Sequence, residues 1–158
     1  RKTERIGVFC GTVDEQWVEY PRPQENGNKT DVRWVSLTDA NGDGLLFTAG
    51  DRPLSVGARY YSTATMEASA YSFEMQRAED LFLNIDYGQQ GVAGVNSWRT
   101  IALPQYQLAE KQPRYSYRIR PLNAGASVDE LLAVEIESFP VSCDDLVLPE
   151  KPAGAKEE

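Results

Sequence analysis

The sequence predicts an all-β domain, an antiparallel β-sandwich, and two observations lead to this prediction. Short runs rich in β-branched and aromatic residues recur between clusters of Gly, Pro, Asn and Asp, which is the spacing of strands and turns. Two of these runs, residues 81–87 and 115–120, alternate their side chains with period two, so each is expected to bury one face. With 158 residues, the chain is long enough for one domain with a proper core.

Six strands are predicted along the chain, each bounded by turn residues. They cover residues 4–10, 31–38, 44–48, 60–69, 80–87 and 115–120. Between them, Pro21 and Pro23 make residues 20–24 extended and unhelical, and Pro104 and Pro113 bracket a second irregular stretch.

One segment near the C-terminus remains ambiguous between helix and strand. Ser127 with Glu130 three residues later resembles a capping box, which predicts a short helix before Leu131. The alternation of Val134 and Ile136 indicates a strand instead. Both interpretations stay open.

The distribution of apolar residues along the sequence predicts the domain boundaries. Residues 146–158 carry Pro, Gly and charge with little to bury, so we expect a loose tail after a sandwich over 1–145. The first residue is Arg1 rather than Met, and we expect the chain to be part of something longer. No apolar run of membrane-spanning length and no signal peptide is present, so no membrane partner is expected and the compartment is not readable.

Charge and composition exclude several classes of function. Sixteen Lys and Arg against 24 Asp and Glu give a formal net charge of −8, which disfavours a nucleic-acid partner. The chain has no histidine, so Ser-His-Asp and Cys-His catalysis are excluded within it, and the usual nitrogen ligand of zinc is missing. Cys10 and Cys143 could form one bridge or remain two buried thiols, and we favour the thiols.

The segment that begins at Asp39 resembles the opening of a calcium loop. Asp39, Asn41 and Asp43 precede Gly44 at the right spacing, but the twelfth position, which should be a bidentate carboxylate, is Gly50. Strand-like residues flank this segment on both sides. We therefore predict a hairpin turn.

Acidic residues cluster near the N-terminus, and they could be interpreted as a glycosidase acid and base. A glycosidase needs two carboxyl groups at a set separation, which the spacing of Asp14, Glu15, Glu19 and Glu25 does not enforce. We therefore favour a solvated acidic face.

Trp98 is the best candidate for a functional residue because of its surroundings. It ends the run GQQGVAGVNSW, in which Gly88, Gly91 and Gly94 recur every third residue directly after a predicted strand. Such a loop can come close to a partner. Trp98 is then either a plug folded onto the sandwich or an exposed platform for a sugar, with Asn96 and Ser97 as polar neighbours for its hydroxyls.

Three blocks of sequence together resemble a known family. They are GTVDEQWVEYPRPQENGNKTDVRWVSLTDANGDGLL at 11–46, LNIDYGQQGVAGVNSW at 83–98 and YSYRIRP at 115–121. In order and spacing, the resemblance spans residues 8 to 121, about seven-tenths of the chain. By these blocks the chain is similar to the C-terminal, small-chain domain of the β-galactosidases of glycoside hydrolase family two.

The resemblance implies half of a β-supersandwich, related in fold to galactose mutarotase, in a multidomain bacterial enzyme. The catalytic glutamates of the family lie in a separate (β/α)8 barrel with active-site magnesium and sodium. No catalytic residue, metal ligand or cofactor is therefore expected in this chain, which alone should be inactive. The expected partners are a β-galactoside and the other domains, with an oligomeric parent enzyme open, as are the cytoplasm and the periplasm.

The resemblance also implies a role for Trp98. The family's C-terminal domain lends one tryptophan to the active site, where it stacks on the sugar, and that motif position falls on Trp98, with Asn96 and Ser97 beside it. The chain departs from the family at Val95, where relatives commonly carry an acidic or amide residue. A carbohydrate-binding or purely structural domain without a role in the pocket is the alternative function.

Overall fold

The computed structural model describes residues 6–19, 26–90 and 101–134. The chain divides into two compact units, Arg1–Ala126 and Ser127–Glu158. The predicted boundary between residues 145 and 146 lies outside the described residues.

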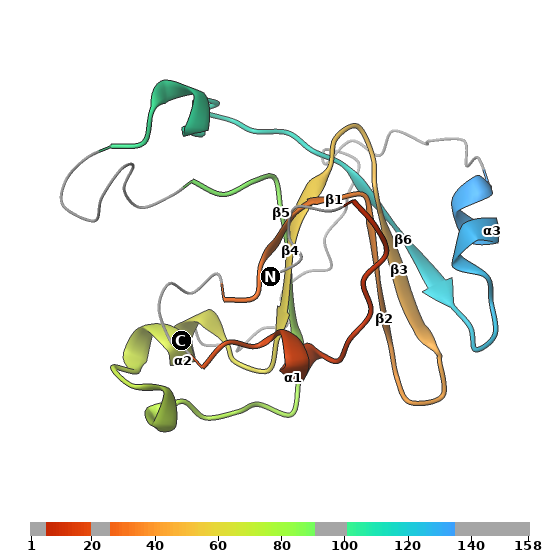
Figure 1. The fold of residues 1–158 in the computed structure, drawn as a ribbon, viewed down its shortest axis with the longest axis horizontal. Helices are drawn as coiled ribbons and strands as arrows, with labels where there is room; N and C mark the ends of the chain where they lie inside the picture. Colours follow the sequence, from red (N-terminus) through yellow and green to blue (C-terminus); the bar gives the residue numbers. More distant parts are fainter. Residues whose placement is uncertain (1–5, 20–25, 91–100, 135–158) are drawn as a thin grey trace, which may run out of the picture. The chain divides into compact units, whose positions relative to one another are not determined.

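In the first unit, two three-stranded antiparallel sheets form the fold. Figure 1 labels their strands. One sheet has the order β1-β4-β5 and the other β2-β3-β6. The strands are β1 (Lys29–Val32), β2 (Trp34–Thr38), β3 (Gly44–Ala49), β4 (Leu54–Arg59), β5 (Phe82–Asp86) and β6 (Tyr117–Leu122). Every pairing is antiparallel, which confirms the predicted all-β, sandwich-like fold.

A single bent hairpin connects the two sheets. Only Arg33 separates β1 from β2, and β2 pairs with β3 while β1 pairs with β4. The N–H of Ala49 donates to the carbonyl of Arg33 at 2.9 Å, which continues the pairing through the bend. The β1–β4 register is interrupted between Lys29 and Val32, where Asp31 adopts a φ of 57°. Such irregularities turn strands from one sheet into another.

The partners of β5 confirm that its side chains alternate between two faces, but all its residues are half-buried, so the expected burial of one face is wrong. The same expectation is wrong for β6, where Tyr117 and Ile119 are 40% and 55% exposed. Ile85 lies opposite Val56 of β4, and Leu83 lies opposite Ala58, so apolar residues share one face. Asn84 lies opposite Gly57 on the other face. The buried apolar residues of the described chain are Leu46, Phe47, Leu54, Val56, Met66, Ala102 and Leu122.

Two predicted strands are wrong. The described part of the first, residues 6–10, contains no strand and is exposed, with Phe9 61% accessible. The segment 60–69 contains helix α2 (Thr63–Ala68) instead. Ser62 caps this helix by accepting from the N–H of Thr65 at 3.1 Å, and Met66 is fully buried, so capping and packing override the strand-like tyrosines before it.

Other short elements complete the described chain. They are α1 (Val13–Gln16), the 3-10 helices η1 (Ser72–Glu74) and η2 (Pro104–Tyr106), and α3 (Val128–Ala133) in the second unit. Ser127 accepts from the N–H of Glu130 at 3.3 Å, so the helix interpretation of this segment is confirmed. None of these helices is long and apolar enough to cross a membrane.

The predicted hairpin turn at Asp39 is also confirmed. It joins β2 to β3, and the side chain of Asp39 accepts from the N–H groups of Asn41 at 2.8 Å and Asp43 at 3.0 Å. One oxygen of Asp43 accepts from the N–H of Ala124 at 2.8 Å. These carboxylates organise backbone, as in an Asx turn.

Gly44 gives the first testable prediction, because it has no room for a side chain. A Cβ at this position would lie 1.9 Å from the carbonyl oxygen of Leu37 and 2.8 Å from the Cα of Thr38, both backbone atoms. We expect Gly44→Ala to lower the free energy of unfolding by about 2 kcal/mol or more. Gly57→Ala is the matched control, since its Cβ would meet Asn28 only at 3.8 Å. Equal unfolding midpoints for the two variants in urea would contradict this account.

Candidate functional site

The sequence-predicted site residues Asn96, Ser97 and Trp98 lie outside the described residues, which stop at Gln90 and resume at Ile101. The structure does describe both flanks of this segment. The site is therefore built from the side chains that hold these flanks.

The flanks meet at Leu108. Its N–H donates to the side-chain oxygen of Gln90 at 2.9 Å, across a sequence separation of 18 residues. A Cβ on Gly88 would lie 3.5 Å from the side chain of Leu108, so the two chain segments are in contact there as well. The described chain after the segment that carries Trp98 thus meets, at Leu108, the residues that follow β5.

Three tyrosines and one arginine, which we call the tyrosine row, lie beside this place. The rings of Tyr87 and Tyr115 are 6.2 Å apart edge to face, and those of Tyr115 and Tyr117 are 6.2 Å apart and stacked. The guanidinium of Arg52 lies 3.7 Å from the ring centre of Tyr87. The Tyr115 hydroxyl donates to the carbonyl of Ile85 at 2.8 Å, which ties β5 to the segment before β6.

A hydrogen-bonded carboxylate, Asp51, lies close to the tyrosine row in the sequence and binds the residue between Tyr115 and Tyr117. One carboxylate oxygen of Asp51 accepts from the Ser116 N–H at 3.1 Å and from the Ser116 hydroxyl at 2.9 Å. The Ser116 hydroxyl is the main reason that the pKa of Asp51 is held below its ordinary value. Burial, with the nearby carboxylate of Asp86, raises the pKa of Tyr115 above its ordinary value.

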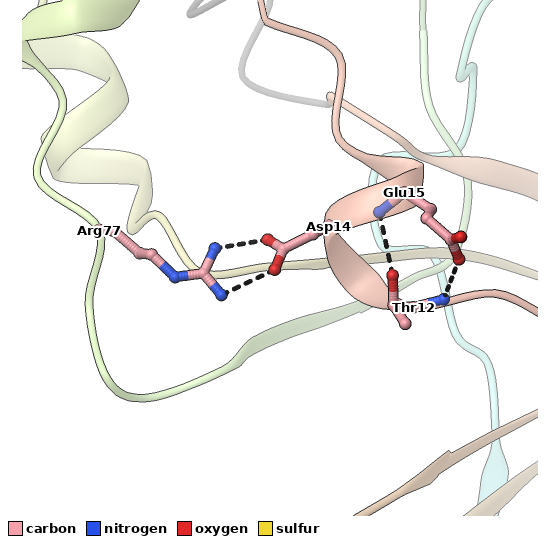
Figure 2. Close-up of polar contacts among 4 residues, drawn as sticks. All are labelled: Thr12, Asp14, Glu15 and Arg77. Carbon is pink, nitrogen blue, oxygen red and sulfur yellow. Dashed lines mark hydrogen bonds and ion pairs between the residues drawn. The ribbon is translucent and has the colours of Figure 1, made fainter.

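A second cluster holds the N-terminal segment, and Figure 2 shows its polar contacts. Thr12 and Glu15 cap each other's backbone N–H at the start of α1, at 3.2 and 2.7 Å. The guanidinium of Arg77 binds both carboxylate oxygens of Asp14 and lies 3.8 Å over the ring of Tyr60. Asp14 raises the pKa of Arg77 through this hydrogen bonding.

The same cluster bears on the acidic residues singled out in the sequence. Asp14 is bound to an arginine and Glu15 caps a helix, so both carboxylates stabilise local structure. Glu19 is exposed, and Glu25 lies outside the described residues. Next to these carboxylates, Trp17 packs on Tyr61 with ring centres 4.5 Å apart. This arrangement favours the structural interpretation of the acidic residues over a catalytic one.

Neither cluster is built to hold a metal ion. Across residues 6–19, 26–90 and 101–134, no group of three or more His, Cys, Asp or Glu side chains is suitably placed. Cys10 has a free, exposed thiol, so the expectation of a buried thiol is wrong for this residue, while Cys143 lies outside the described residues.

Sequence reasoning missed the two arginines that organise these clusters. Arg52 lies 35 residues before Tyr87, and Arg77 lies 63 residues after Asp14, so no local period reveals the contacts. It also missed helix α1, although Thr12 and Glu15 have the spacing of a capping box that could have revealed it.

The two antiparallel sheets define an all-β, sandwich-like module. The family described as beta galactosidase small chain matches residues 1–120, and the chain belongs to this family.

Individual relatives agree with the family. Beta-galactosidase BgaC of Bifidobacterium adolescentis is 34% identical over 115 residues, 72% of this chain and 11% of the relative. The beta-galactosidase of Priestia megaterium is 35% identical over 124 residues, 77% of this chain and 12% of the relative. The beta-galactosidase of Lactobacillus delbrueckii subsp. bulgaricus is 36% identical over 118 residues, which are 74% of this chain and 11% of the relative. The matched part of the chain thus spans only 11–12% of the length of these relatives.

The hydroxyl of Tyr115 gives a second prediction. Tyr115→Phe removes its hydrogen bond to Ile85 and keeps the ring stack, so we expect the free energy of unfolding to fall by about 1 kcal/mol. Tyr117→Phe is the control because it keeps the stacked ring and leaves the bond to Ile85 in place. Chemical denaturation measures both. A loss as large in the control would show that the bond to Ile85 does not matter.

Asp51 gives a prediction about pH. Its pKa in the folded chain lies below the ordinary 3.8, so its stabilising contribution is present above that value and is lost as pH falls through the folded pKa. Asp51→Asn removes this titration. We expect its unfolding temperature to fall less than that of the wild type between about pH 5 and pH 2. Glu79→Gln, at an exposed carboxylate, controls for the loss of one charge, and parallel curves for all three proteins would refute the role of Asp51.

Proposed function

We propose that this chain is the non-catalytic C-terminal domain of a β-galactosidase that hydrolyses terminal β-D-galactosides, and that Trp98 stacks on the sugar. The family match over residues 1–120, which includes the glycine-rich segment before Trp98, carries this proposal. The described flanks support it, because the contacts of Gln90 and Gly88 with Leu108 return the chain to one place.

We assign the chemistry of hydrolysis to the rest of the enzyme. The matched part of the chain spans 11–12% of the relatives, has no histidine, and uses Asp14 and Glu15 for structural contacts. Retaining hydrolysis needs two carboxyl groups that flank the glycosidic bond, and we assign these to another domain. The magnesium and sodium of such an enzyme are assigned to that domain too, since the described residues offer no fitting ligand group.

The role of Trp98 follows from the chemistry of sugars. One face of a galactose ring presents C–H groups, which pack on the flat apolar surface of an indole, while the hydroxyls seek polar neighbours. Asn96 and Ser97, immediately before Trp98, supply such polar groups in this proposal. The neighbouring glycines let the backbone come close to the ligand.

Replacement of Trp98 tests the proposal in the full-length enzyme. We expect Trp98→Ala to raise KM for lactose or a nitrophenyl galactoside about tenfold, because about 1.4 kcal/mol of stacking is lost. Trp98→Phe should recover part of this loss, since it restores an aromatic surface. Trp34→Phe in β2 is the control and should leave KM unchanged.

The alternative is a binding or purely structural domain. Unchanged kinetics in Trp98→Ala would exclude the stacking role and favour that alternative. Titration of the isolated chain with galactose, followed by tryptophan fluorescence, would then separate the two forms of it. Saturable binding indicates a binding module, and the variant at Trp98 identifies its signal among three tryptophans.

A further inference from the structure

The segment 12–18, which contains α1 and which we call the strap, crosses one end of the sheet β1-β4-β5. Antiparallel pairing brings the start of β1, the end of β4 and the start of β5 to the same end of this sheet. The strap contacts the chain next to each of them in the order of the strands. Asp14 binds a residue before β5, Trp17 packs on one after β4, and Val18 is bonded to one before β1.

Side chains, rather than strand pairing, hold the strap in place. None of its residues is buried, and none belongs to a strand. The ring of Trp17 lies 4.5 Å from that of Tyr61. The side chain of Asn26 accepts from the Val18 N–H at 2.9 Å and donates to the Val18 carbonyl. Segments with few buried apolar contacts open at a lower free energy than the sheets that they cover.

An ion pair fastens the strap at α1, as Figure 2 shows. The guanidinium of Arg77 binds both carboxylate oxygens of Asp14, one of them at 3.0 Å, across 63 residues of sequence. Arg77 is itself seated over the ring of Tyr60, at 3.8 Å. The side chains of Arg77 and Asp14 are 45% and 60% exposed, so dissolved ions reach this pair and weaken it by screening.

We propose that the strap opens from the sheet β1-β4-β5 while both sheets stay folded, and that the Asp14–Arg77 pair is the latch that sets how often it opens. Opening separates Trp17 from Tyr61 and uncovers the ring faces that now contact each other. Because the latch is an exposed ion pair, ionic strength controls the opening. This inference goes beyond the proposed function and does not depend on Trp98.

Hydrogen exchange in the full-length enzyme tests the latch, read by mass spectrometry on peptides that cover the strap, β3 and β4. Arg77→Gln removes the forked ion pair, and we expect the strap to exchange about fivefold faster while β3 and β4 keep their rates. Arg77→Lys should recover part of the protection, since it restores the charge without the fork. Arg114→Gln, at an exposed arginine elsewhere in the chain, is the matched control and should change no peptide.

Salt gives an independent measurement of the same latch. Raising NaCl from about 0.1 M to about 1 M should speed exchange of the strap in the wild type by a similar factor, because the ions screen the pair. The same change of salt should have little effect on the strap in Arg77→Gln, where no ion pair is left to screen. Asp14→Asn removes the latch from its other side and replaces Arg77→Gln if that variant does not fold.

The outcomes separate this inference from the proposed function. Faster exchange confined to the strap, both in Arg77→Gln and in the wild type at high salt, supports the inference whatever the KM of Trp98→Ala. An equal change in the strap and strand peptides shows that the strap opens only when the sheets unfold, and overturns it. An unchanged rate for the strap in Arg77→Gln overturns it too.

Discussion

At the corner between β3 and β4, the chain passes so close to Ser116 that only glycine fits. A Cβ on Gly50 would lie 2.1 Å from the Ser116 hydroxyl and 2.9 Å from the Ser116 carbonyl oxygen. The N–H of Gly50 instead donates to that carbonyl at 2.9 Å. This contact lets β3 leave one sheet while β4 enters the other. The two sheets share one hairpin, so their connection depends on this absent side chain.

The same corner extends toward the candidate site. Asp51, the next residue, binds the N–H and hydroxyl of Ser116, and Arg52 after it lies over Tyr87. Ser116 is flanked by Tyr115 and Tyr117, so fixing its backbone fixes the start of the tyrosine row. Tyr87 directly precedes Gly88, where the segment toward Trp98 begins. A short chain of hydrogen bonds and ring contacts thus connects the sheet corner to the base of the loop.

The sequence predicts those elements whose signal lies within a few neighbouring residues. Period-two alternation found β5 and β6, and the NGDG turn found the β2–β3 hairpin. The sequence reasoning missed β4. Its residues Leu54, Val56 and Ala58 do alternate with Ser55, Gly57 and Arg59, but the short run contains glycine, which is depleted in strands, and tertiary packing buries both Ser55 and Arg59. The tyrosine row could not be predicted either, because Arg52, Tyr87 and Tyr115 meet only through tertiary contacts. The glycine-rich run singles out Trp98 but leaves a plug and a platform both open, and the family resemblance is what implies the platform.

Tyr117 connects the sheet β2-β3-β6 to the tyrosine row. It lies opposite Ala49 of β3, and its ring stacks on Tyr115. The stack therefore couples the position of the Tyr115 ring to strand β6. Tyr115 in turn is bonded to Ile85 in the strand that leads to the loop. Through Tyr115 and Tyr117, the strand that precedes the glycine-rich segment is therefore linked to both sheets.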